Sequence, residues 1–184
     1  MKKIILLTLL YAIYSISYAQ GIFADEVTSD GLRIITGDPV YVSDITDDVE
    51  FLVSLCYSNY EGTSTYGIAI TSVFKSDFNV KKGMRLLLKD KKNNIVELQA
   101  MADAYSLIKA DDASHLVYYL DAFYEVSEET LNRLSDGIIK MRLENNCGAF
   151  DKEWKEDKMG AVLKKELNAI KRKVSIEKDF YSDF

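Results

Sequence analysis

Four residues around one predicted β-hairpin have side chains suited to ligand binding. Tyr57, Asn59, Tyr60 and Tyr66 lie within or beside a polar segment, residues 58–66, that contains Glu-Gly-Thr-Ser-Thr. A tyrosine ring combines an apolar face with a polar hydroxyl, which suits contact with a sugar or with another protein. Tyrosine is also common in β-strands for purely structural reasons. Strand formation alone therefore explains each of these tyrosines without a binding role. We interpret residues 58–66 as the candidate binding loop for a protein or a glycan.

The two cysteines, Cys56 and Cys147, are the only candidates for redox chemistry. Cys56 falls within an apolar predicted strand, and Cys147 follows the last predicted strand. Export would permit a disulfide between them. Two buried free thiols explain the same residues equally well. The sequence leaves both possibilities open.

Catalytic and metal-binding patterns are missing from the sequence. A zinc site needs three or four His, Cys or acidic ligands, and His115 is the only histidine. No Gly-x-Ser-x-Gly elbow accompanies it, and the glycines are dispersed at predicted turns. The acidic loops at residues 44–48 and 111–112 lack the Asp-x-Asp-x-Asp-Gly pattern of a calcium loop. We therefore expect no cofactor, no metal and no catalytic residue.

Apolar residues at every second position predict strands with one buried face. The clearest hairpin joins residues 49–57 to residues 66–74 through a loop at 58–64, and a second joins 84–89 to 95–101. A Gly-Asp-Pro turn at 37–39 predicts a hairpin between residues 31–36 and 40–43. Further strands are expected at 115–126 and 138–143. Residues 103–114 fit either a loop or a short helix.

Two helices are expected late in the chain. Ser127 suits an N-cap, and Glu128 and Glu129 suit the first turn of a helix at 127–135. A second, amphipathic helix near 158–174 carries its apolar residues at spacings of three and four. The chain is thus predicted to be mainly β with helices (α+β). We expect an antiparallel β-sandwich or partly open barrel of about seven or eight strands with a C-terminal helix.

The first nineteen residues are typical of a cleavable signal peptide. Lys2 and Lys3 precede an apolar run over residues 4–13, and Ser17 and Ala19 place small residues before a cut at Gln20. The run is about half the 20 residues needed to span a membrane. We expect a periplasmic or secreted protein with no membrane span after cleavage, and a single domain over residues 20–184.

The charge of the mature chain argues against polyanionic partners. Removing residues 1–19 takes away two lysines, so 21 basic and 29 acidic side chains remain, with a formal charge of −8. Nucleic acid and anionic lipid both need a basic surface. We expect binding to neither of them.

The segment 126–142 resembles small exported β-rich proteins of Bacteroides-type bacteria that have no known activity. There a strand ends, a capped helix follows, and Gly-Ile-Ile-Lys-Met-Arg resumes as a strand. The resemblance covers about 20 residues, together with the signal peptide. It implies a periplasmic or secreted setting and brings no site residue.

Three functions remain compatible with these features. The first is a non-enzymatic module that binds a protein or a glycan of the cell envelope through tyrosine-bearing loops. The second is a carboxylate-dependent hydrolase acting on envelope or glycan material, which needs two acids about 5–9 Å apart in a cleft. The third is a small outer-membrane barrel, which needs about eight strands of some ten residues each.

Overall fold

The computed structural model describes residues 21–43, 49–75, 77–112 and 115–182. The predicted signal peptide and the acidic loop at 44–48 lie outside them. One large sheet holds β1 (Ile22–Val27), β2 (Arg33–Gly37), β3 (Val40–Tyr41), β4 (Val49–Tyr60), β5 (Thr63–Phe74), β10 (Leu107–Asp112) and β11 (His115–Val126). A second sheet holds β7 (Arg85–Asp90), β8 (Ile95–Gln99), β12 (Ile138–Asn145) and β13 (Gly148–Glu153). The remaining elements are β6 (Asn79–Val80), β9 (Ala104–Tyr105), α2 (Glu128–Leu134) and α3 (Met159–Ser182).

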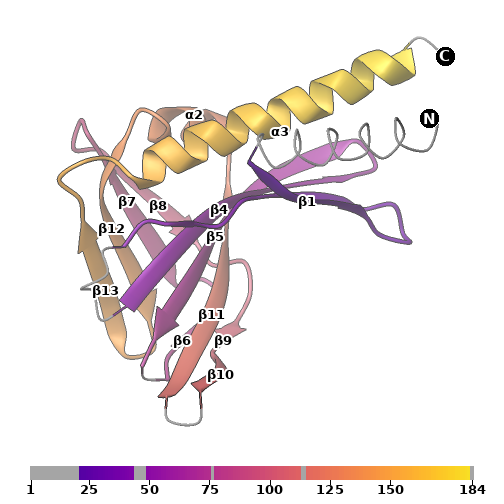
Figure 1. Cartoon of the computed structure of the whole chain (residues 1–184). Helices are drawn as coiled ribbons and strands as arrows, with labels where there is room; N and C mark the ends of the chain where they lie inside the picture. The colour runs from indigo at the N-terminus through magenta and orange to yellow at the C-terminus, as the bar shows by residue number, and fades with distance from the viewer. Residues whose placement is uncertain (1–20, 44–48, 76, 113–114, 183–184) are drawn as a thin grey trace, which may run out of the picture.

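The large sheet is antiparallel and curled into a half-barrel. Its order is β1-β2-β4-β5-β11-β10, with β3 also paired to β4, and the second sheet has the order β13-β12-β7-β8. In Figure 1 the second sheet lies beside one half of the large sheet, and α3 runs across the other half. The predicted class, mainly β and antiparallel with a C-terminal helix, is confirmed.

The core lies between the two sheets and α3. On β4 the buried residues follow the predicted alternation, because successive side chains of a strand point to opposite faces. Its inward residues are Phe51, Val53, Leu55 and Tyr57. The apolar stripe of α3 is buried as predicted, at Met159, Leu163, Leu167 and Ile170. The helix is longer than the predicted span of 158–174.

The central hairpin is tighter than the sequence predicts. β4 and β5 remain paired from Val49↔Phe74 to Tyr60↔Thr63, so the predicted loop at 58–64 is mostly strand. Only Glu61 and Gly62 form the turn, with φ values of 49° and 82°. A two-residue turn with positive φ at both positions matches the twist of the strands on either side. The tyrosines of this region are therefore held by a rigid sheet.

The predicted hairpin around Gly37-Asp38-Pro39 is wrong. β2 and β3 do not pair with each other; both pair with β4, β2 at Cys56–Asn59 and β3 at Leu52–Val53. The hairpin partner of β2 is β1. Proline cannot donate a backbone hydrogen bond, which suits an interruption along one side of β4.

A buried carboxyl group from α3 fills this interruption. Glu166 is 1% exposed, and its Oε2 accepts a hydrogen bond of 2.5 Å from the Leu55 backbone N–H. Burial raises the pKa of Glu166 to about 8, and Asp38 nearby acts in the same direction. A Cβ atom on Gly37 would overlap the Glu166 carboxylate. Glycine at position 37 therefore leaves room for the Glu166 carboxyl group, which accepts a hydrogen bond from the Leu55 N–H of β4.

Two further differences concern the sheet edges. Residues 104–105 and 107–112 form the strands β9 and β10, where the sequence predicts a loop or a short helix. Residues 148–153, for which no strand is predicted, form β13 and pair with β12. β11 lies between β5 and β10, which confirms the central position predicted for residues 115–126.

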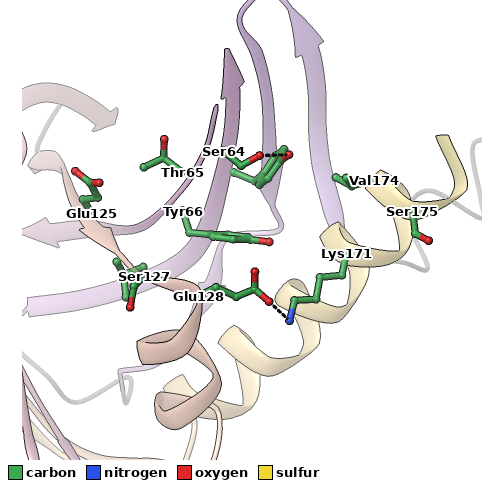
Figure 2. Close-up of a pocket in the computed structure, with 11 residues that line it drawn as sticks. Ser64, Thr65, Tyr66, Glu125, Ser127, Glu128, Lys171, Val174 and Ser175 are labelled. Atoms are coloured by element: carbon green, nitrogen blue, oxygen red, sulfur yellow. Dashed lines mark hydrogen bonds and ion pairs between the residues drawn. The ribbon is translucent and has the colours of Figure 1, made fainter. Parts of the chain in front are cut away.

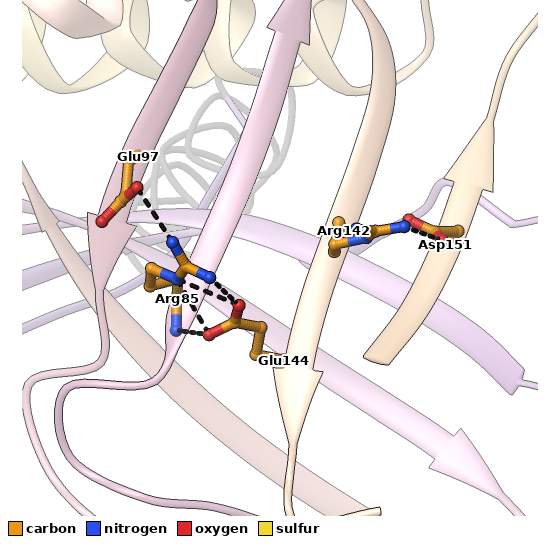
Figure 3. Close-up of polar contacts among 5 residues, drawn as sticks. All are labelled: Arg85, Glu97, Arg142, Glu144 and Asp151. Carbon is orange, nitrogen blue, oxygen red and sulfur yellow. Dashed lines mark hydrogen bonds and ion pairs between the residues drawn. The ribbon is translucent and has the colours of Figure 1, made fainter. Parts of the chain in front are cut away.

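The outer face of the second sheet carries paired charges (Figure 3). Arg85 Nε donates to Glu144 Oε1 at 2.9 Å, and Arg142 Nη2 donates to Asp151 Oδ2 at 2.7 Å. Arg85 also lies 3.5 Å from Glu97. These cross-strand pairs join four strands of one face, and their charged groups are partners to one another. The charged groups named here are therefore paired with one another at the surface.

Candidate functional site

A hollow of about 650 Å³ lies where the β4–β5 hairpin meets the two helices (Figure 2). It has the size typical of small-molecule sites, about 300–1,000 Å³. We call it the tyrosine pocket. Its lining residues are Tyr57, Ser64, Thr65, Tyr66, Glu125, Val126, Ser127, Glu128, Lys171, Val174 and Ser175.

Two of the four predicted binding residues line this pocket. Tyr57 and Tyr66 are cross-strand partners, and their ring centroids are 5.3 Å apart with an interplanar angle of 60°. Tyr57 is 5% exposed, whereas Tyr66 is partly exposed. The pair therefore gives the pocket one deep ring and one accessible ring.

The other two predicted residues lie outside the lining. The Asn59 side chain donates a hydrogen bond of 2.8 Å to the Oγ of Ser64, which is a lining residue. Tyr60 stands at the tip of the hairpin, 45% exposed, next to the Glu61–Gly62 turn. The structure thus separates the two tyrosines of the pocket from the one at the tip.

Hydroxyl groups dominate one wall. Tyr57 Oη and Ser64 Oγ are 2.9 Å apart and hydrogen bonded, and Thr65 adds a further hydroxyl. Burial raises the pKa of Tyr66 to about 12, and the neighbouring Glu128 contributes in the same direction. The Tyr66 phenol therefore keeps its proton at neutral pH and can donate a hydrogen bond to a ligand.

An ion pair forms the opposite wall. Lys171 Nζ of α3 lies 2.6 Å from Glu128 Oε1 in the first turn of α2. Ser127 Oγ caps this helix by accepting from the Thr130 N–H at 3.1 Å, as the sequence predicts. The cap holds Glu128 at the pocket, a position that the capping pattern alone did not reveal.

The pocket contains two carboxylates, but they do not face each other. Glu125 comes from the end of β11 and Glu128 from α2. Figure 2 shows the Glu125 carboxylate turned away from Tyr66, while Glu128 points to Lys171. A glycosidase of the usual two-carboxylate type needs one acid on each side of the bond that it cleaves. This arrangement supplies polar contacts rather than an acid pair.

The two cysteines lie in different parts of the fold and are both free thiols. Cys56 is on β4 of the large sheet, and Cys147 is in the turn between β12 and β13. The disulfide that the sequence left open is therefore not formed. Burial raises the pKa of the Cys56 thiol, which makes it a poor nucleophile.

Over the residues that the structure describes, no group of three or more His, Cys, Asp or Glu side chains is placed to hold a metal ion. Within the same ranges, none of the helices combines the length and the apolar character needed to cross a bilayer. Comparison with known protein families, with characterised proteins and with solved structures finds no match to this chain. Function must therefore be inferred from the chemistry of the site itself.

Proposed function

We propose that this protein is an exported, non-enzymatic binding module that holds part of a glycan in the tyrosine pocket. One observation carries the proposal: a partly exposed tyrosine ring, Tyr66, lies between a hydroxyl-bearing wall and a neutralised ion pair. The predicted signal peptide and the resemblance to exported proteins support a periplasmic or secreted setting, where envelope glycans are available.

The chemistry of the lining favours a ligand that is rich in hydroxyl groups. The Tyr66 ring offers an apolar face to the C–H groups of a sugar ring, and its phenol donates a hydrogen bond. Ser64, Thr65 and the Glu128–Lys171 pair provide donors and acceptors on both sides of that ring. Because Lys171 neutralises Glu128, the pair has no net charge, and it can hydrogen bond to the hydroxyl groups of an uncharged ligand.

A peptide that adds as a strand is less well supported at this pocket. Such binding needs an open sheet edge. Here Tyr57 and Ser58 of β4 are paired with both β2 and β5, and Tyr66 is paired with both Tyr57 and Val126. The backbone is therefore occupied, and recognition depends on side chains.

A printed glycan array that covers neutral, acidic and amino sugars tests the proposal. We expect the mature protein to bind a subset of these glycans. Tyr66→Ala should weaken that binding at least about tenfold, because it removes the accessible ring. Tyr60→Ala is the matched control: it removes the same side chain from the same hairpin, outside the pocket, and should leave binding unchanged.

A second variant separates loss of binding from loss of folding. Ser175 lines the pocket from α3 and is exposed, so we expect Ser175→Trp to reduce the open volume of the pocket and to leave the core intact. We expect it to abolish binding with unchanged thermal unfolding. The proposal is overturned if no glycan binds, if Ser175→Trp binds normally, or if the bound glycans are cleaved, since cleavage would indicate a hydrolase.

A further inference from the structure

A second hollow, of about 490 Å³, adjoins the tyrosine pocket. We call it the Gln99 hollow; its lining residues are Lys82, Gln99, Ala100, Met101, Glu125, Val126 and Ser127. Both hollows share Glu125, Val126 and Ser127. Because these three residues line both hollows, the two hollows lie next to each other, and we call the shared residues the ridge. We call the two hollows and the ridge together the groove.

The Gln99 hollow arises where the edges of the two sheets meet. A single bridge, Ala100↔Tyr124, joins the end of β8 to β11, and the Met101 N–H donates to the Phe123 carbonyl at 2.9 Å. In the described part of the chain, no strand pairs with this edge of β11 beyond Tyr124. The open edge is only three residues long before α2 begins. Three residues are the lower limit of strand length, which is usually about 3–10 residues with a mode of about 5–6, so an added peptide strand would have little to pair with here.

The charged groups of the groove balance. Its acids are Glu125 and Glu128, and its bases are Lys82 and Lys171, one in each hollow. The mature chain as a whole is acidic, which disfavours a polyanionic ligand. A ligand that crosses the ridge therefore meets no net formal charge and is best matched by a neutral molecule.

The exposed side chains of the Gln99 hollow match those of the tyrosine pocket in kind. The Gln99 amide provides a donor and an acceptor, and the Lys82 ammonium provides further donors. Met101, 47% exposed, offers an apolar surface. The hollow thus also combines an apolar surface with polar groups.

We propose that the ligand is a neutral, linear oligosaccharide that crosses the Glu125–Ser127 ridge and places sugar units in both hollows. This inference rests on the proposed function, because it extends the same site. It adds two statements: affinity depends on chain length, and neutral chains bind in preference to acidic ones. Gln99 and Lys82 contact only the part of the chain that lies beyond the ridge.

Calorimetric titration with size-graded oligosaccharides tests this inference. The probes are gluco-, xylo-, manno- and chito-oligosaccharides, each as disaccharide and hexasaccharide, with oligogalacturonides as the acidic series. We expect at least one neutral hexasaccharide to bind about tenfold more tightly than its disaccharide. The double variant Lys82→Ala/Gln99→Ala should lose this gain and keep the disaccharide affinity. Lys92→Ala, at an exposed turn, is the control for the lost charge.

The possible failures are distinguishable. Equal affinity for disaccharide and hexasaccharide, or preference for the acidic series, overturns the extended neutral ligand and leaves the proposed function standing. An unchanged length dependence in the double variant also overturns it, because the longer chain would then not enter the Gln99 hollow. If none of the sugars binds, both the proposed function and this inference fail.

Discussion

Lys171 Nζ and Glu128 Oε1 are 2.6 Å apart, and this contact ties the C-terminal helix to the first turn of α2 across the tyrosine pocket. The two residues are 43 positions apart in the sequence, and both side chains are 39–50% exposed. Exposed ion pairs contribute about 0–1 kcal/mol to stability. The pair therefore shapes the pocket more than it stabilises the fold.

Lys171→Met should lower glycan affinity about tenfold with little change in thermal unfolding. The substitution removes the donor and leaves the Glu128 carboxylate unneutralised at the site. Lys164→Met, at an exposed position of the same helix, is the matched control and should bind like the natural protein. Equal affinity of the two variants, measured by calorimetry, would exclude Lys171 from the binding site.

Glu166 should make stability depend on pH in an unusual direction. Its pKa is about 8 in the folded chain, against an ordinary value of 4.5, because burial penalises the charged form. Between these values the folded state holds a proton that the unfolded state has lost. The free energy of unfolding therefore falls as pH rises through this window, by at most about 1.4 kcal/mol per pH unit.

Glu166→Gln should remove this contribution. The amide oxygen can still accept from the Leu55 N–H, and no charge develops at high pH. We expect the variant to gain stability relative to the natural protein as pH rises from about 5 to about 8. Urea unfolding at a series of pH values measures the difference, with Glu156→Gln at an exposed position as control. A difference that stays constant with pH would contradict the assignment.

Gly37→Ala should be destabilising because the new methyl group would overlap the Glu166 carboxylate. Forcing an extra carbon into a packed site costs about 1–3 kcal/mol. Gly67→Ala is the control: a Cβ there lies 3.7 Å from the Tyr124 carbonyl oxygen, an ordinary contact. It should be neutral or stabilise slightly, since glycine weakens a strand. If both variants unfold at the same urea concentration, the close packing at Gly37 is disproved.

Local patterns were sufficient to predict most of the fold. Alternation along residues 49–57 and 66–74 predicted the central hairpin, and Ser127 predicted the cap of α2. The prediction of a hairpin turn at Gly37–Pro39 was wrong, because the Glu166 carboxyl group that fills this interruption is far away in the sequence. A strand such as β13 has little apolar alternation and depends on pairing with β12 for its conformation.

The candidate site was predicted only in part. Tyr57 and Tyr66 could be selected because they flank one turn, and cross-strand pairing brings them together. Lys171 and Glu128 could not be selected as binding residues, because no local spacing in the sequence indicates that α3 crosses the start of α2. Tyr60 was predicted to bind a ligand because it lies in the polar segment 58–66. The two-residue turn places it at the tip of the hairpin, outside the lining of the pocket.

A crystal structure of the mature protein with the best-bound neutral hexasaccharide would locate the ligand. We expect one sugar ring against Tyr66, hydroxyl groups hydrogen bonded to the Glu128–Lys171 pair, and further rings beyond the Glu125–Ser127 ridge near Gln99. Density for the sugar elsewhere, with the tyrosine pocket occupied only by water, would contradict the proposed site.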